Sequence, residues 1–180
     1  RGGYFCVLES GFLLQVLHNC LNCEDEDEIT RIYQKCKTPE HVILHMKKVA
    51  EVVQHIMIEL QEKTGRYPIT KRNALYKSAL LHDILRMEKN HAKKAADFLK
   101  KEGYKEAADL ISLHHSCKYN DRMDEIEIHE ILFYADKLVQ EDRCVSLEER
   151  FSKSLEKYKG NQEAEERHKR LYEKAVLIKE

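Results

Sequence analysis

The amino-acid sequence predicts an all-α protein, folded as a bundle of about seven to nine helices. Only two Pro and six Gly interrupt its 180 residues, a composition typical of helix-rich proteins. Apolar residues recur at the three- and four-residue spacing of amphipathic helices, and runs of β-branched residues are few. Hydrophobic residues make up 42% of the chain and charged residues 35%, which suits one buried core with a solvated surface.

The charge balance argues against two classes of partner. The chain holds 31 basic and 32 acidic residues, for a net charge of −1, so we expect no nucleic acid and no membrane as partner. Its longest apolar stretch is far shorter than the ~20 residues that span a bilayer. Residues 1–20 lack the pattern of a signal peptide, and six widely spaced Cys suit reduced thiols, so we expect a cytoplasmic protein. The chain begins at Arg1, which leaves open whether a further domain precedes it.

Three regions are expected along the chain. Residues 1–37 form an N-terminal helical extension of unknown role, with an apolar segment over 9–22 and an acidic run from Glu24 to Glu28. Residues 38–145 form the main domain. Residues 146–180 form C-terminal helices that pack on it.

The helices of the main domain follow from caps and breaks. Thr38 as N-cap, with Pro39 at the first helical position, predicts a long helix that ends near Gly65. A second helix begins near Thr70 and carries Leu75 and Ala79. Further helices are expected over about 91–101, 105–116 and 125–141.

The C-terminal region carries two helix signals. Ser146 with Glu149 makes a capping box for a helix over 147–158. After the break at Gly160-Asn161, a last and highly charged helix runs to about 177.

Several His and Asp residues fall where amphipathic helices place apolar side chains. His45 lies four residues before Val49, and Asp136 lies four residues after Leu132. A buried, unpaired Asp or imidazole costs several kcal/mol, and a bound metal ion removes that cost. The candidate metal ligands are His45, His82, Asp83, His91, His114, His115 and Asp136.

These residue types indicate the metal and its chemistry. Imidazole and carboxylate together suit Fe, Mn, Zn, Co or Ni, with Mg as an alternative. We expect one ion at His45, His82, Asp83 and Asp136, and a second at His91, His114 and His115, with Asp83 bridging. Two ions a few Å apart can activate a water and hold a phosphate on both sides of an in-line attack.

Five local strings, in their order along the chain, carry a resemblance to a known family. They cover residues 38–140 and read TPEHVILHMKKVAEVV, ALLHDI, NHAKKAADFLKKEGY, LISLHHS and FYADKLV. The order His45, His82-Asp83, Asp136 resembles the HD-domain metal-dependent phosphohydrolases, and the additional His91 and His114-His115 resemble their dinuclear branch. The resemblance therefore implies that the helical bundle is an HD domain.

A second string resembles a particular group of these proteins. Residues 142–155, DRCVSLEERFSKSL, are similar to the tail of HD domains fused to molybdenum-cofactor cytidylyltransferase-like proteins. The spacing from His82-Asp83 to His91 is shorter than in the HD-type diadenosine tetraphosphatases, which makes a dinucleotide polyphosphate a less favoured substrate.

The resemblance implies an enzyme that hydrolyses a nucleotide or another small phosphate ester or anhydride through a metal-activated water. It gives catalytic roles to Asp83, His82 and Arg86, with Asp83 the bridging ligand that orients the water. The candidate phosphate-binding cations are Arg86, Lys137, Lys118 and Lys48.

Other functions stay open on the sequence alone. The same ligands are compatible with a regulatory module that binds a nucleotide without hydrolysing it, or with a di-iron oxygenase on the same scaffold. Cys20 and Cys23, with His18 and Cys36, offer a weak zinc pattern. A homodimer through the N- or C-terminal helix is also compatible with the pattern.

Overall fold

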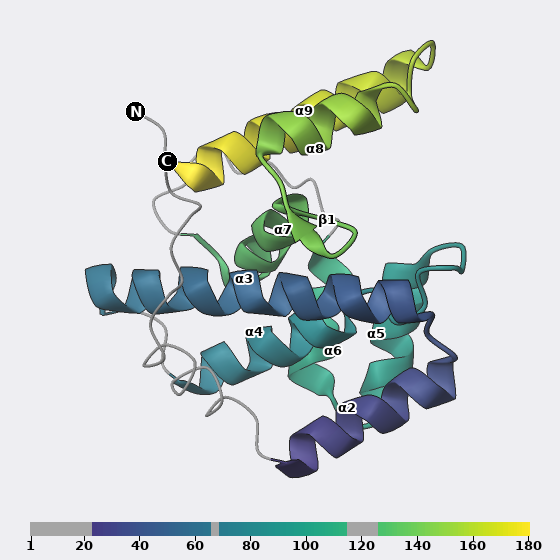
Figure 1. Ribbon diagram of the computed structural model, residues 1–180, viewed down its shortest axis with the longest axis vertical. Coiled ribbons are helices and arrows are strands. Elements are labelled where there is room, and N and C mark those ends of the chain that lie inside the picture. The colour runs from purple at the N-terminus through teal and green to yellow at the C-terminus, as the bar shows by residue number, and fades with distance from the viewer. Residues whose placement is uncertain (1–22, 66–68, 115–125) are drawn as a thin grey trace.

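A computed structural model describes residues 23–65, 69–114 and 126–180 (Figure 1). Within these residues the fold is all-α, as predicted, with eight helices and one pair of short strands. Helices α2 to α7 span Cys23–Cys36, Glu40–Thr64, Ile69–Leu81, His91–Lys101, Lys105–Leu113 and Ile128–Lys137. They are followed by strands β1 (Val139–Gln140) and β2 (Arg143–Cys144) and by helices α8 (Leu147–Leu155) and α9 (Gln162–Lys179).

The long helix α3 crosses the middle of the molecule, with the α8–α9 pair on one side and α2 on the other (Figure 1). Its predicted end is confirmed, because Gly65 takes the left-handed conformation (φ 65°) that ends a helix. The predicted cap is wrong. Pro39 is the N-cap residue, and the Thr38 hydroxyl donates a hydrogen bond of 2.9 Å to the carbonyl oxygen of Ile84 instead. Thr38 thus joins the start of α3 to the turn after α4.

Helix α2 holds the last turn of α4, just before that turn of the chain. It contains the acidic run Glu24–Glu28, and three of its apolar side chains are buried in the common core. One of them, Tyr33, donates a hydrogen bond of 2.8 Å from its hydroxyl to the carbonyl oxygen of Leu80. The bonds from Tyr33 and Thr38 therefore fix the backbone on both sides of the His82-Asp83 pair.

The chain after α7 differs from the helix predicted over 125–141. Helix α7 ends at Lys137, and β1 pairs with β2 in antiparallel register, with Val139 opposite Cys144. Between the strands Glu141 takes a positive φ of 56°, which reverses the chain. Strands of two residues are too short to produce an alternating pattern, so they could not be predicted from the sequence.

The C-terminal helices begin where they were predicted. Ser146 caps α8 by accepting a hydrogen bond of 3.1 Å from the backbone N–H of Glu149, and the Asn161 side chain caps α9 in the same way. Helix α9 packs against α7, where the buried Lys174 ammonium lies 3.1 Å from a carboxylate oxygen of the buried Glu130. Helix α7 is therefore supported from the C-terminal side of the chain.

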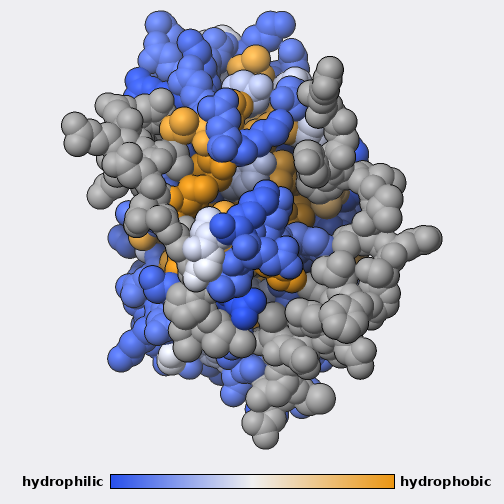
Figure 2. All heavy atoms as spheres, turned by 90° about the vertical axis from the view of Figure 1, so that its left-hand side faces the viewer, coloured by the Kyte–Doolittle hydropathy of each residue, from blue (hydrophilic) through white to orange (hydrophobic). Residues whose placement is uncertain are grey.

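One hydrophobic core joins α2 through α9 around α3 and α4. On the face shown in Figure 2, hydrophobic side chains gather between hydrophilic ones. The large hydrophobic residues that are exposed in the described ranges are Leu44, Met87, Leu113, Leu155 and Tyr158. None of the helices in those ranges has both the length and the apolar run needed to cross a membrane.

Candidate metal centre

Three helical segments bring His45, His82 and Asp136 together. His45 comes from the second turn of α3, His82 follows the end of α4, and Asp136 lies in the last turn of α7. The Nε2 atom of His45 is 3.2 Å from Asp136 Oδ1, and the Nε2 atom of His82 is 3.7 Å from the same oxygen. All three side chains are buried, so residues 91 positions apart in the chain share one desolvated centre.

The Asp83 carboxylate faces two groups of imidazoles. Its Oδ2 atom lies 3.6 Å from His82 Nε2 and 4.0 Å from His45 Nε2. Its Oδ1 atom lies 3.3 Å from the Nε2 atom of His91, at the start of α5. His45, His82 and Asp83 can together hold one ion, and Asp83, His91 and His114 can hold another.

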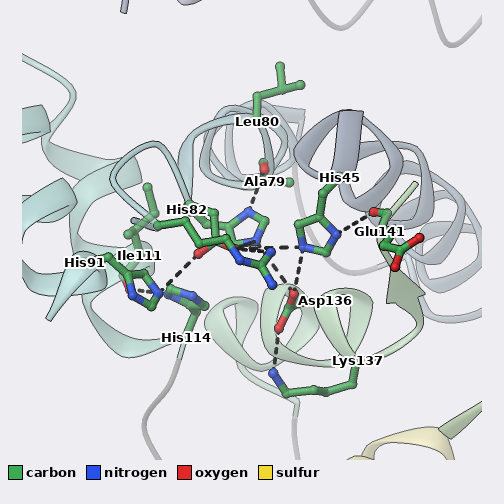
Figure 3. A network of polar contacts seen from close by, with 12 residues as sticks. His45, Ala79, Leu80, His82, His91, Ile111, His114, Asp136, Lys137 and Glu141 are labelled. Atoms are coloured by element: carbon green, nitrogen blue, oxygen red, sulfur yellow. Dashed lines mark hydrogen bonds and ion pairs between the residues drawn. The ribbon is translucent and has the colours of Figure 1, made fainter. Parts of the chain in front are cut away.

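Backbone carbonyl groups fix the orientation of three of these rings. The Nδ1 atoms of His45, His82 and His114 lie 2.8, 2.8 and 2.6 Å from the carbonyl oxygens of Glu141, Ala79 and Ile111 (Figure 3). A carbonyl oxygen can only accept, so each Nδ1 carries a proton and donates it. This arrangement makes Nε2 the ring nitrogen that could bind a metal ion, in the way that a second hydrogen bond orients a metal-bound histidine.

The polar atoms at the centre fit a cation. His82 Nε2 is fully buried and makes no hydrogen bond, although two carboxylate oxygens lie 3.6 and 3.7 Å away. These distances are too long for a hydrogen bond. The nitrogen and the two oxygens could instead donate electron pairs to one cation placed among them. Imidazole nitrogens and carboxylate oxygens form a donor set for divalent transition metals.

A protein-family model described as the HD domain matches residues 42–153, more than half of the chain. The chain belongs to the HD domain family. Most members of this family are metal-dependent phosphohydrolases. The match spans all the candidate ligands from His45 to Asp136, and no curated protein or solved structure matches the chain.

Burial and neighbouring charges shift the pKa values of the ionisable groups at this centre. Burial alone raises the pKa of a carboxyl group, but His82 and His91 beside Asp83, and Lys137 and His45 beside Asp136, hold both pKa values well below their usual range. Burial lowers the pKa of His82, yet the neighbouring Asp83 and Asp136 outweigh it and raise that pKa. The ionised carboxylates therefore favour positive charge at the imidazoles, from either a proton or a metal ion.

Two cations of the HD domain contact the candidate ligands directly. Arg86 donates a hydrogen bond of 3.0 Å from Nη1 to Asp83 Oδ2, and its side chain is 41% exposed. Lys137 Nζ lies 2.5 Å from Asp136 Oδ2 and is only 13% exposed. Arg86 is thus at the rim of the centre, while Lys137 lies behind Asp136, on the side away from the histidines (Figure 3).

The other predicted residues lie elsewhere. Lys48 contacts Glu51, one turn further along α3. His115, Lys118, His18 and Cys20 fall outside the described residues. The carbonyl group of Glu141 was not anticipated, because backbone atoms have no signature in the sequence and the turn that carries this one belongs to the unpredicted strand pair.

Proposed function

We propose that the chain is a metal-dependent phosphohydrolase that acts on a small phosphate ester or anhydride, with a nucleotide as the preferred substrate class. The observation that carries this proposal is the Asp83 carboxylate, since one of its oxygens lies 3.6 Å from His82 Nε2 and the other lies 3.3 Å from His91 Nε2. A carboxylate so placed suits a ligand shared by two ions.

The candidate ligands would form two groups, one for each ion. His45, His82, Asp83 and Asp136 would hold one ion, and Asp83, His91, His114 and His115 a second, drawn from Fe, Mn, Zn, Co, Ni or Mg. Bound ions would supply Lewis-acid activation of a water and of the phosphate oxygens.

The protonation state of Asp83 limits its role. Because its low pKa keeps the carboxylate ionised, Asp83 is suited to binding a cation and orienting a water molecule rather than storing a proton. The partly exposed Arg86 guanidinium is suited to hold the substrate phosphate at the rim, because one N–H donates to Asp83 and the group has further donors. Lys137 neutralises part of the charge on Asp136.

The proposal also covers the branch of the family, the domain limits, the location and the oligomeric state. We assign the chain to the dinuclear branch of the HD family and, from residues 142–155, to relatives of the domains fused to molybdenum-cofactor cytidylyltransferase-like proteins. The HD domain proper covers residues 38–145, with 1–37 as an extension and 146–180 as helices packed on it. A cytoplasmic location and a homodimer complete the proposal.

Metal content and phosphate release test the function together. Protein purified without chelator should carry one or two equivalents of transition metal, as is usual for such sites, and should release phosphate from a nucleotide panel. Asp83→Ala should lose most of both, whereas Asp97→Ala, an exposed Asp on α5, should lose neither. A wild type that stays metal-free and inactive when offered Mn²⁺ or Fe²⁺ would overturn the proposal. Metal with tight nucleotide binding but no release would indicate a regulatory module, and reaction with oxygen would indicate an oxygenase.

A further inference from the structure

The turn that carries His82 and Asp83 is fixed through backbone carbonyl groups. It follows the end of α4, and the last carbonyl oxygens of a helix have no partner within that helix. The Ala79 oxygen accepts a hydrogen bond of 2.8 Å from His82 Nδ1, so a candidate ligand supplies this bond itself. The oxygens of Leu80 and Ile84, one on each side of the pair, accept from side chains in a different part of the chain.

The two side chains that reach this turn come from the end of α2 and the residues just after it. The Tyr33 hydroxyl donates to the Leu80 oxygen at 2.8 Å, and the Thr38 hydroxyl donates to the Ile84 oxygen at 2.9 Å. Burial raises the pKa of Tyr33, so its hydroxyl keeps the proton that it donates. Because the Tyr33 bond is buried, its loss would leave a carbonyl group without a partner and away from water.

The backbone joins Tyr33 and Thr38 into one unit. The backbone N–H of Thr38 donates to the carbonyl oxygen of Tyr33 at 3.0 Å, and that of Lys37 donates to the carbonyl oxygen of Gln34 at 3.1 Å. Between them Lys37 takes the left-handed conformation, with a φ of 51°. This pair of bonds around a left-handed residue is the Schellman motif that ends many helices. The motif therefore holds the two side chains at a fixed separation, one for each side of the turn.

Further contacts anchor α2 to the connection between α5 and α6. The Lys35 ammonium lies 2.5 Å from a Glu102 carboxylate oxygen, and the Tyr104 hydroxyl donates a hydrogen bond of 2.7 Å to Glu28. Helix α5 begins at His91, a candidate ligand of the second ion. Helix α2 thus contacts both the turn after α4 and the end of the helix that begins with this histidine.

Metal binding is sensitive to the position of the backbone that carries the ligands. A bound ion requires ligand distances within about 0.2 Å of their preferred values. His82 and Asp83 lie on the short piece of backbone between the two bonded carbonyl groups, and their donor atoms Nε2 and Oδ2 are 3.6 Å apart. Removal of a group that orients a metal ligand typically lowers metal affinity about 10- to 100-fold. Loss of either hydroxyl should therefore weaken metal binding at the turn.

We propose that Tyr33 and Thr38 are positioning residues of the candidate metal centre, which hold His82 and Asp83 in the arrangement that binds an ion. Each acts through a backbone carbonyl group of the turn. Both residues precede residues 42–153, the range that matches the HD domain, so this support comes from outside that range. The inference rests on the metal site of the proposed function and assigns a role to helix α2.

Metal affinity of the full chain tests the inference without hydrolysis. Metal-free protein is titrated with Co²⁺, whose visible absorption reports both the amount bound and the geometry of its ligands. The temperature is kept well below the melting point of every variant, so that a loss of global stability leaves the dissociation constant unchanged. Tyr33→Phe and Thr38→Val each remove one hydroxyl and should raise the dissociation constant about tenfold and change the absorption spectrum. Thr38→Ser keeps the hydroxyl and should bind Co²⁺ as the wild type does.

Two control variants remove the same groups elsewhere on or near α2. Tyr104→Phe removes the hydroxyl that bonds to Glu28, and Thr30→Val removes one that bonds to the carbonyl oxygen of Glu26. Both bonds are exposed and lie away from the turn, so each variant should change the dissociation constant less than about twofold.

The outcomes separate this inference from the proposed function. If Tyr33→Phe and Thr38→Val bind Co²⁺ with wild-type affinity and spectrum, or no more weakly than the two controls, the inference is overturned. Phosphate release by the wild type would then leave the phosphohydrolase proposal standing. If the wild type binds Co²⁺ but releases no phosphate, and both variants bind the ion more weakly, the proposed activity fails and the positioning role stands. A wild type that binds no Co²⁺ overturns both.

Discussion

His45 Nδ1 donates a hydrogen bond of 2.8 Å to the backbone carbonyl oxygen of Glu141, and this contact joins the central helix α3 to the turn between β1 and β2. The opposite nitrogen of the ring faces Asp136 at 3.2 Å. The orientation of His45 at the candidate metal centre therefore depends on a backbone atom 96 residues further along the chain. Glu141 contributes only its backbone to this contact, and it does so from a left-handed conformation (φ 56°).

Substitutions of Glu141 should separate its backbone from its side chain. Glu141→Gly should retain full metal content and change the free energy of unfolding by less than about 1 kcal/mol, because relief of the left-handed conformation is offset by the chain entropy of glycine. Glu141→Pro forces φ to a negative value, displaces the carbonyl group and should lower metal content. Elemental analysis and thermal melting of both variants check this. Loss of metal from Glu141→Gly would show that the carboxylate matters.

The two groups of ligands should lose metal separately. If Asp83 is shared by two ions, His91→Ala should reduce metal content from about two equivalents to about one, because the ligands of the other site remain. His45→Ala should remove the ion from the buried group and leave the one at His91 and His114. Elemental analysis under identical purification gives the stoichiometry.

His55 provides a control, because its replacement removes an imidazole that is not a candidate ligand. His55 lies on α3 with its Nδ1 2.7 Å from the carbonyl oxygen of Glu51, away from the centre, so His55→Ala should keep full metal content. Metal content in His91→Ala that is equal to wild type would show that His91 is not a ligand to an ion.

The sequence predicted the parts of this site that depend on helix periodicity. His45 and Asp136 fall on apolar stripes, and both are buried. Their convergence on His82 was a hypothesis that rested on residue type and expected burial, and the resemblance supported it, because periodicity places a residue on a helix face but does not say which helix that face meets. The helix end at Gly65 was also predicted, and this glycine has the positive φ value of a residue that ends a helix.

Hydrogen bonds to distant backbone carbonyl groups could not be predicted from the sequence. Thr38 has the residue type and position of an N-cap, but its hydroxyl bonds to Ile84, 46 residues away. Similarly, the turn at Glu141 follows a helix whose apolar pattern continues through Val139, so the pattern predicted more helix. In both places tertiary contacts override a local preference.

Arg86 should affect substrate binding without affecting metal. Arg86→Ala should raise KM for a phosphorylated substrate about tenfold, equivalent to ~1.4 kcal/mol, by removing one charge-assisted contact to the phosphate. Metal content should stay at the wild-type value, because Arg86 is hydrogen-bonded to Asp83 but offers no electron pair to an ion. Lys94→Ala, which removes a cation paired with Glu88 at 2.5 Å, serves as the control. Equal KM values for the two variants would remove Arg86 from the substrate site.

The buried ion pair between α9 and α7 should contribute strongly to stability. Lys174→Met leaves Glu130 buried without its partner and should lower the free energy of unfolding by about 3–5 kcal/mol in urea denaturation. Lys169→Met, on the same helix with a side chain 76% exposed, should change it by less than about 0.5 kcal/mol. Combining Lys174→Met with Glu130→Leu should recover much of the loss. A double variant as unstable as the sum of the two single variants would indicate that the cost comes from packing rather than from the stranded charge.

His168 should make the stability of the C-terminal hairpin depend on pH. Burial, and then the charge of Lys137, lower the pKa of His168 in the folded protein. As the pH falls through the ordinary pKa of histidine, the unfolded chain therefore takes up a proton that the folded protein does not, and the free energy of unfolding decreases. His168→Gln removes this term, so the loss of stability between about pH 7.5 and about pH 5.5 should be smaller than in wild type. Urea denaturation of both proteins at the two pH values measures the difference, and because the other histidines are common to both, their contributions cancel. Parallel losses would mean that His168 is protonated as readily in the folded protein as in the unfolded chain.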